Sequence, residues 1–250
     1  MLEDEFGDII KKARNGLNIS LKSLEEKTKI KEKDLSLMEA YKSKPNNEQI
    51  EKLSKVLKLN SEKLKNIVNG WEPKKKVLKD KDVEVERIEN DYYGYNVNSY
   101  LIIKGKEALA VDTGAHPETI TYKAKERNVE LKALLITHGH TDHAGGKEEF
   151  GCKIIEDIND KELKIGNFKV KAIRISGHTA TSNSFLINKF LFVGDELFAG
   201  SIGGSHIPYE KHLENIKNKI FSLDEKVIIL PGHGPMTSVK EEKENNPFYS

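Results

Sequence analysis

The chain has 250 residues, which allows one large domain or two modest ones. Its 41 Lys and Arg residues nearly balance 40 Asp and Glu residues, so the formal net charge is +1. This balance excludes a uniformly basic protein that coats nucleic acid and an acidic disordered tail. The sequence has no apolar run near the roughly 18 residues of a membrane span, so no membrane partner is expected. The acidic start, Met1 to Glu5, predicts no signal peptide. Because a single cysteine, Cys152, cannot form an internal disulfide, we expect a cytoplasmic protein.

The spacing of apolar residues and the use of β-branched residues divide the chain into two parts. Residues 1–70 predict helices only, because apolar residues recur at helical spacing and no run of β-branched residues appears. Residues 71–80 combine Pro73 with several lysines and suit an exposed linker. Residues 81–250 alternate short β-rich runs with helical stretches and Gly-rich turns. We therefore expect an α+β protein in which a small all-α domain precedes a larger domain.

The first part predicts five short helices separated by tight turns. Ser20 is the predicted N-cap of the second helix, and Asn60 or Ser61 is that of the fifth. Pro45 excludes a helix through its own position. The inward-facing apolar residues of the five helices lie within 9–17, 21–24, 35–38, 50–57 and 64–67, and the third helix is expected to end near Tyr41.

This order of helices resembles the helix-turn-helix domain of Cro-type repressors. The residues that carry the resemblance are Ile19–Ile30, Leu35–Glu39, Pro45 and Ile50–Leu59. The resemblance implies that the third helix enters the major groove of DNA, with Lys31, Lys33 and Ser36 as candidate contacts, and that the protein is a homodimer. Glu32 and Asp34 lie among these positions and weaken attraction to phosphates. A helical bundle that mediates dimerisation or protein contact is therefore the alternative.

A dense group of metal-binding residue types follows the apolar run Leu131–Thr137, which is typical of a strand buried on both faces. The next six residues are His-Gly-His-Thr-Asp-His, from His138 to His143, and hold three of the eight histidines. We expect Gly139 to let the backbone turn so that both flanking rings face one centre. Imidazole and carboxylate groups suit zinc, iron and manganese. The sequence therefore predicts a metal site here.

Three more candidate ligands, His178, Asp195 and His233, share one local pattern. Each follows an apolar strand-like run that ends in a glycine, at residues 177, 194 and 232. Since sites are usually built on loops that leave strand ends, we expect these three side chains to join the group at 138–143.

Residues 83–250 resemble the metallo-β-lactamase superfamily, through the His-x-His-x-Asp-His signature, Asn98-Ser99-Tyr100 and Val111–Gly114. The resemblance implies an αββα sandwich of two packed sheets with a dinuclear site at one edge. The implied cofactors are two divalent metals, with zinc first and iron or manganese as alternatives. The implied ligands are His138, His140 and His178 for one metal, Asp142, His143 and His233 for the other, and Asp195 as the bridge.

Hydrolysis fits such a site, because two metals about 3.5–4 Å apart can hold a hydroxide that attacks a carbonyl. Asp142 and Asp195 are then the catalytic carboxylates, and no Ser or Cys nucleophile is needed. We interpret Cys152 as a core residue.

The segments 194–203 and 231–238 resemble glyoxalase II-like hydrolases of the short type, which implies a small thioester or ester as substrate. That family often has an Arg and an Asp after the Gly-Ser stretch, where this chain has Gly204 and His206. Only 17 residues follow His233, where longer members carry a helical domain that helps to hold glutathione. Both differences point away from glutathione thioesters.

Three other functions stay open. The first is a persulfide dioxygenase with one iron held by His138, His178 and Asp195. The second is a DNA-binding regulator whose metal domain acts as a sensor. The third is a lactonase, because lactones and thioesters require the same attack on a carbonyl.

Further histidines and tyrosines are interpreted from their local sequence. His206 follows a flexible Gly-Gly-Ser segment and is a candidate substrate contact. Tyr92, Tyr93 and Tyr95 fit either a cleft rim or ordinary packing. His212 lies in a Lys/Glu-rich helical run and is predicted to be solvated.

Overall fold

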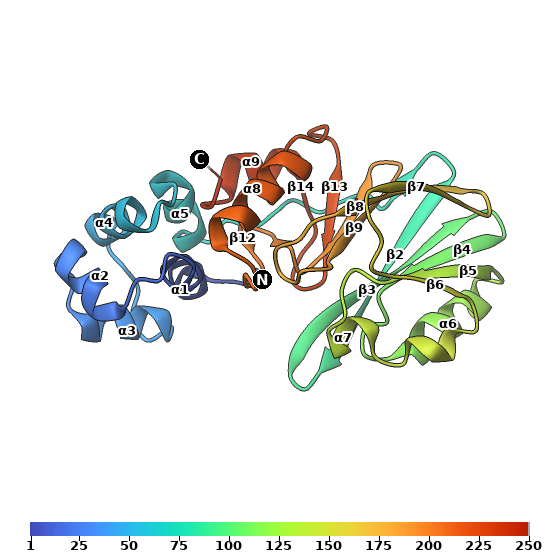
Figure 1. Cartoon of the computed structure of the whole chain (residues 1–250), viewed down its shortest axis with the longest axis horizontal. Helices are drawn as coiled ribbons and strands as arrows, with labels where there is room; N and C mark the ends of the chain where they lie inside the picture. Colours follow the sequence, from blue (N-terminus) through green and yellow to red (C-terminus); the bar gives the residue numbers. More distant parts are fainter. Residues whose placement is uncertain (250) are drawn as a thin grey trace.

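The computed structural model of the chain describes residues 1–249 and shows a helical unit beside a unit of two β-sheets (Figure 1). The helices of the first unit are α1 (Phe6–Gly16), α2 (Leu21–Thr28), α3 (Glu32–Glu39), α4 (Asn47–Leu57) and α5 (Ser61–Val68). The five predicted helices are therefore present. Their apolar faces meet in one core that includes Ile9, Leu24 and Leu53, all fully buried.

Polar side chains fix where these helices begin. Ser20 Oγ accepts a hydrogen bond of 3.1 Å from the Ser23 amide, which confirms Ser20 as the N-cap of α2. Asn60 Oδ1 accepts one of 3.1 Å from the Lys63 amide, so Asn60 rather than Ser61 caps α5. Each cap satisfies a backbone N–H group that the helix itself leaves without a partner.

The second unit is built on two six-stranded sheets. The first sheet has the order β1 (Lys79–Asp80), β2 (Val83–Tyr92), β3 (Tyr95–Lys104), β4 (Glu107–Val111), β5 (Glu130–Leu135), β6 (Lys153–Ile155). The second has the order β14 (Thr237–Ser238), β13 (Ile228–Pro231), β10 (Phe190–Gly194), β9 (Asn183–Ile187), β8 (Phe168–Arg174), β7 (Lys161–Ile165). A small hairpin joins β11 (Leu197–Phe198) to β12 (Ser201–Ile202).

The remaining helices of the second unit are α6 (Pro117–Glu126), α7 (Thr141–Ala144), the 3-10 turn η1 (Lys147–Phe150), α8 (Tyr209–Lys219) and α9 (Val239–Asn245). Side chains of both sheets, such as Leu109 and Phe185, form the core between the sheets. The outer face of the first sheet packs against α6 through Ile120, and that of the second packs against α8 through Ile216. The layers are therefore helix, sheet, sheet and helix, as expected for a metallo-β-lactamase fold.

The helical unit packs against the second unit, near the end of the described chain. The Asn60 amide donates to the Pro247 carbonyl at 2.8 Å, and Lys63 Nζ donates to the Lys243 carbonyl at 2.6 Å. Leu17 and Phe248 pack against the cores of both units. Among the described residues, none of the helices has the length and apolar character needed to cross a bilayer.

Candidate metal centre

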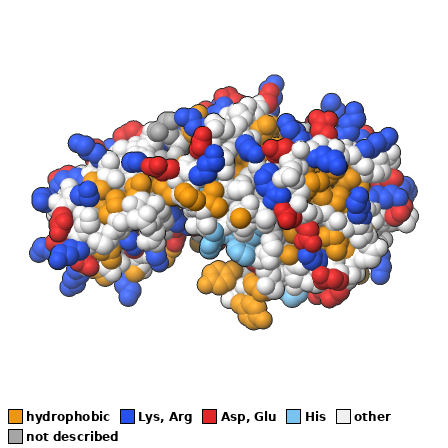
Figure 2. Space-filling view, viewed as in Figure 1, with side chains coloured by type: hydrophobic (Ala, Val, Ile, Leu, Met, Phe, Trp, Pro, Cys, Tyr) orange, Lys and Arg blue, Asp and Glu red, His pale blue; other side chains and the backbone are white. Residues whose placement is uncertain are grey.

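The candidate ligands gather where several strands end. β4 and β5 run parallel, as do β10 and β13, so the carboxyl ends of each pair meet at one edge of their sheet. His138 and α7 follow β5, Asp195 follows β10, and His233 follows β13. His178 lies in the turn after β8. Figure 2 shows pale blue histidine side chains together at the lower edge of the molecule, between the two units.

Three imidazoles form the first group of donors. His138 Nε2 and His178 Nε2 each lie 3.0 Å from His140 Nδ1. A single ring nitrogen has one proton or one lone pair, so His140 Nδ1 cannot satisfy both neighbours by hydrogen bonding. A cation shared by the three nitrogen atoms would satisfy all of them at once.

A second group combines two imidazoles with a carboxylate. His143 Nε2 lies 3.3 Å from His233 Nε2. Asp142 Oδ2 lies 3.5 Å from His143 Nε2 and 3.4 Å from His233 Nε2. This group holds a mixed nitrogen and oxygen donor set of the kind that divalent transition metals accept.

Asp195 lies between the two groups. Its Oδ2 is 3.7 Å from His178 Nε2 in the first group and 3.5 Å from His233 Nε2 in the second. Its Oδ1 is buried and accepts no hydrogen bond. A buried carboxylate oxygen without a partner is costly, and coordination to a cation would remove that cost.

Neighbouring groups orient the rings from outside. His143 Nδ1 donates to Asp112 Oδ2 at 2.9 Å, and Asp112 also accepts from the Thr137 amide at 2.7 Å. His233 Nδ1 donates to the Asn96 carbonyl at 2.7 Å, and His178 Nδ1 donates to the Gly204 carbonyl at 3.0 Å. These bonds hold each Nε2 lone pair toward the centre, as in many metal sites.

The electrostatics of the cluster divide the imidazoles into two kinds. Burial lowers the pKa of His138 to about 2 and that of His178 to about 4, which keeps both rings neutral. Burial also opposes the charge of His233, but hydrogen bonds to Asp142 and Asp195 outweigh it and raise its pKa to about 11.

The carboxylates of the cluster stay ionised. Burial opposes the charge of Asp195, yet the imidazoles of His143 and His233 hold its pKa well below the usual range. The pKa of Asp142 is also lowered, by the His233 hydrogen bond against the effect of burial. Neutral imidazoles and ionised carboxylates are the forms that bind metals. His138, His178, Asp142 and Asp195 have these forms already, whereas His233 would release its proton to a bound divalent ion.

The other residues that the sequence analysis named lie outside the two donor groups. His206 is exposed, with its ring centroid 5.6 Å from that of His178. Lys31, Lys33 and Ser36 are exposed on and next to the first turns of α3 in the helical unit, apart from this cluster. Cys152 is partly buried and packs against the core under α6.

Two interpretations of single residues were wrong. His212 is fully buried rather than solvated, with Nε2 3.0 Å from Glu196 Oε2 and Nδ1 2.7 Å from Ser205 Oγ. His212 lies three residues after Tyr209 and four before Ile216, and both of these are buried on α8. This helical spacing would have assigned His212 to the inner face of the helix. Gly139 does not need the freedom of glycine, because its φ is not left-handed and a Cβ there would contact nothing within 4 Å.

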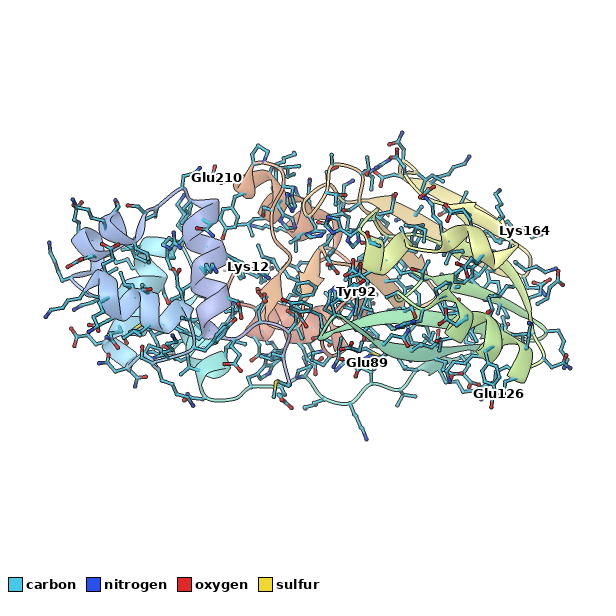
Figure 3. The ribbon with its side chains drawn as sticks, turned by 90° about the horizontal axis from the view of Figure 1, so that it is seen from below. Lys12, Glu89, Tyr92, Glu126, Lys164 and Glu210 are labelled. Atoms are coloured by element: carbon cyan, nitrogen blue, oxygen red, sulfur yellow. The ribbon has the colours of Figure 1, made fainter. Side chains whose placement is uncertain are left out.

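The sequence did not predict that the helical unit forms one wall of the cleft that contains these donors. This cavity has a volume of about 510 Å³ and is lined by Asp142, His178 and Asp195, but also by Glu3, Asp4 and Lys12 of the helical unit and by Tyr92 and Tyr95. Figure 3 shows Lys12 on α1 and Tyr92 at the end of β2, on opposite sides of the cleft. The local pattern of the sequence gave no signal for this wall, because the cleft brings the first residues of the chain next to donors that lie far away in the sequence.

Tyrosine side chains of the β2–β3 hairpin lie beside the cleft. Tyr93 and Tyr95 are 87% and 68% exposed at the tip of the β2–β3 hairpin. In Figure 2 an orange projection hangs beside the histidines at the place of this hairpin in Figure 1. Of the two alternatives for these residues, the cleft rim is therefore the one observed for Tyr92 and Tyr95.

Known proteins are similar to this chain in sequence and in fold. The family model described as the metallo-beta-lactamase superfamily matches residues 92–151. Hydroxyacylglutathione hydrolase GloC of Haemophilus influenzae is 30% identical over 185 residues, which cover 57% of this chain and 87% of that protein. The probable metallo-hydrolase YqgX of Bacillus subtilis is 28% identical over 192 residues, covering 60% of this chain and 91% of the relative.

Solved structures of other proteins share the fold of this chain. The B3 metallo-beta-lactamase BLEG-1 superposes with a TM-score of 0.61 at 27% identity, over 66% of this chain and 99% of that one. ETHE1 from Myxococcus xanthus superposes with a TM-score of 0.58 at 22% identity, over 65% of this chain and 83% of that one, and shares the fold. With two sheets, seven candidate donors at their edge and relatives that are hydrolases, this chain belongs to the metallo-β-lactamase superfamily.

Proposed function

We propose that the protein is a dinuclear metal-dependent hydrolase that acts on a small thioester. The observation that carries the proposal is the pair of donor groups on either side of Asp195, whose Oδ1 is buried without a hydrogen bond. The thioester is supported by the relative named hydroxyacylglutathione hydrolase, because an S-acyl glutathione is a thioester. Zinc is the preferred metal, and the Bacillus subtilis relative PksB is a probable zinc-dependent hydrolase.

The proposed ligands are those expected from the sequence. His138, His140 and His178 would hold one metal, and Asp142, His143 and His233 would hold the other. Asp195 would bridge them. When bound, the two ions would supply a hydroxide near neutral pH and polarise the substrate carbonyl.

The side chains of this protein have separate tasks in that reaction. Hydrolysis adds the oxygen of water to the acyl carbon, breaks the C–S bond and moves one proton from water to the leaving sulfur. The Asp142 side chain is 20% exposed and faces the cleft, so it can accept a hydrogen bond from the attacking water. Tyr92 and Tyr95 supply aromatic surface for the acyl group at the rim.

Two measurements test this proposal on the full chain. Purified without added metal, the protein should contain about two metal ions per chain by mass spectrometry. It should release free thiol from S-lactoylglutathione or from a pantetheine thioester. Asp195→Asn should lower kcat/KM by about 100-fold or more, because outer partners alone cost 10–100-fold. Asp224→Asn, at an exposed turn of the same unit, should leave it unchanged.

A mononuclear-iron persulfide dioxygenase is the first alternative. It is favoured by the compact arrangement of His138, His178 and Asp195, whose Oδ2 lies 3.9 Å from His138 Nε2 and 3.7 Å from His178 Nε2. One iron per chain, with oxygen uptake on glutathione persulfide and no thiol release from thioesters, would replace the hydrolase by this activity. A protein that binds no metal would contradict both enzymes.

We propose DNA binding as a second activity, through a Cro-type helix-turn-helix in residues 1–70. It is supported by the exposure of Lys33 and Ser36 on α3 and of Lys31 at its N-cap. Fluorescence anisotropy with a duplex of random sequence should show binding that weakens as salt rises. The double variant Lys31→Glu, Lys33→Glu should abolish it, whereas Lys55→Glu on the exposed face of α4 should not. The absence of binding at low salt would leave a helical unit without a DNA role.

A further inference from the structure

The helical unit forms part of the metal cleft. Lys12 of α1, together with Glu3 and Asp4 before it, lines the same cavity as His140 and Asp142. These residues are more than 100 positions from the metal donors in sequence. A substrate bound at the donors therefore meets side chains of the first 20 residues of the chain.

A second cavity lies along α1, next to the cleft. This groove, called here the α1 groove, has a volume of about 400 Å³ and runs between α1 and residues 202–209. Lys12 and Gly204 line both cavities, so the groove adjoins the cleft that holds the metal donors. Its polar side chains include Asn15 and Asn18 on one wall and Ser205 on the other.

The wall formed by α1 is held rigidly. Lys12 Nζ donates to the Asp4 carboxylate and, at 2.8 Å, to the Ile202 carbonyl. It also lies 4.9 Å from the centre of the Phe198 ring. Gly16 packs so closely on Tyr209 that a Cβ atom would lie 2.4 Å from its ring. The α1 groove is therefore preformed, which lowers the entropic cost of binding a ligand there.

The polar groups of the groove favour an uncharged ligand. Lys12 is paired with Asp4, so its charge is compensated within the protein. Among the described residues that line the groove there is no carboxylate and no guanidinium, and the one basic side chain besides Lys12 is the exposed imidazole of His206. The Asn15 and Asn18 side chains are exposed, and each amide can donate and accept hydrogen bonds. Amide groups of a ligand are the natural partners of such side chains.

We propose that the α1 groove binds the thiol half of the thioester substrate, and that this half is an uncharged chain carrying amide groups. The inference rests on the proposed hydrolase function, since the acyl carbon must lie at the metal donors. It makes the helical unit a substrate-recognition element and assigns Asn15 as a specificity-determining residue.

Binding is tested first, without any reaction. S-methylpantetheine has an amide-bearing uncharged tail and no free thiol, so it cannot bind a metal through a thiolate. Calorimetry on the full chain should detect it. Asn15→Trp, which fills the groove from an exposed helix position, should weaken binding at least tenfold, and Asn15→Ala should weaken it severalfold. Lys22→Trp, exposed on α2 and outside the groove, should bind as the wild type does.

Kinetics provide the second test. Asn15→Trp should raise KM for S-acetylpantetheine about tenfold and leave methyl thioacetate, which has no tail, unchanged. Equal loss on both substrates, or no loss on either, would overturn the assignment of the groove. So would tighter binding of S-methylglutathione, whose tail carries carboxylates, than of S-methylpantetheine.

The two proposals fail in different ways. A wild-type protein that hydrolyses neither thioester contradicts the proposed function. If S-methylpantetheine still binds and Asn15→Trp still weakens that binding, the groove remains an amide-binding site. A wild-type protein that cleaves methyl thioacetate but does not bind S-methylpantetheine contradicts the groove proposal alone.

Discussion

Gly232 shows how a single missing side chain makes room for the candidate metal site. A Cβ atom at this position would lie 2.2 Å from Asp195 Oδ1 and 2.5 Å from His143 Cε1. Neither neighbour is free to move, because both are buried and belong to the donor groups. The glycine before His233 is therefore needed for close approach rather than for an unusual backbone conformation.

We expect Gly232→Ala to displace Asp195 and to lower metal affinity by about 10–100-fold, the range seen when the surroundings of metal ligands are disturbed. Metal content after dialysis against a weak chelator measures this effect. Gly139→Ala is the matched control, because its Cβ would meet nothing within 4 Å. Equal metal retention in both variants would show that the site tolerates the added methyl group.

Glu242 is a buried acid outside the metal cluster. It is fully buried on α9, accepts hydrogen bonds from the Gly200 amide at 3.0 Å and from Thr237 Oγ1 at 2.7 Å, and has no ion-pair partner among the described residues. Burial raises the pKa of its carboxyl group from 4.5 to about 7, against the effect of these hydrogen bonds. The folded state therefore holds a proton that the unfolded state loses at lower pH.

The stability of the protein should depend on pH through this group. Below about pH 4.5 both states are protonated and Glu242 has no effect. As the pH rises from 4.5 to 7, the unfolded state loses its proton first, so the free energy of unfolding falls by up to about 3 kcal/mol. Urea unfolding should show Glu242→Gln more stable than the wild type at pH 8 and similar to it at pH 4.5.

The exposed Glu244 on the same helix offers a control for this prediction. Glu244→Gln removes the same charge from α9 without altering a buried group. If Glu244→Gln changed the pH dependence as much as Glu242→Gln did, the effect would come from the charge of the helix and not from burial.

At the scale of elements, α2 ends at a residue other than glycine in the left-handed region. Lys29 follows the last residue of the helix, and its φ is 62°. Its amide donates to the Glu25 carbonyl at 2.7 Å and so ends the helix. A side chain in this conformation costs about 1 kcal/mol.

Lys29→Gly should therefore stabilise the helical unit by about 0.5 kcal/mol, since the greater entropy of glycine in the unfolded chain offsets part of the gain. Lys22→Gly, in the first turn of the same helix, should destabilise it by up to about 1 kcal/mol. Thermal unfolding followed by circular dichroism measures both. Destabilisation of similar size in the two variants would contradict the left-handed role of Lys29.

Elements with strong local patterns were predictable from the sequence. The α5 helix combines an Asn60 cap with Leu64 and Ile67 on one face, and all of this information lies within nine residues. By contrast, β7 and β9 were not predicted, because β7 is a short edge strand rich in lysine and glutamate, and β9 begins with Asn and Ser. Their strand state depends on pairing with β8, which neither segment encodes alone.

At the scale of the whole molecule, the two units share a tight interface. Trp71, the single tryptophan, lies against Gly200, where a Cβ would approach its ring to 3.2 Å. Hydrogen bonds from Lys63 and Asn60 reach the last described residues of the chain. The two units should therefore not unfold independently.

We expect a single unfolding transition of the metal-loaded protein in urea, with Trp71 fluorescence and far-ultraviolet circular dichroism changing together. Trp71 reports on the interface, whereas the dichroism reports on helices and strands of both units. A fluorescence change at clearly lower urea than the loss of secondary structure would mean that the helical unit separates first.

The sequence by itself determined the chemistry of the donors and the helices of the first unit. The donors at 138–143 lie within six residues, and His178, Asp195 and His233 each follow a strand and a glycine, so short segments contain the whole signal. Only the tertiary structure decided that His212 is buried against Glu196 and that α1 forms a wall of the cleft. The hydrogen bond from Lys12 to Ile202 joins residues 190 positions apart. No local period or motif encodes such a contact, because it depends on how two folded units pack against each other.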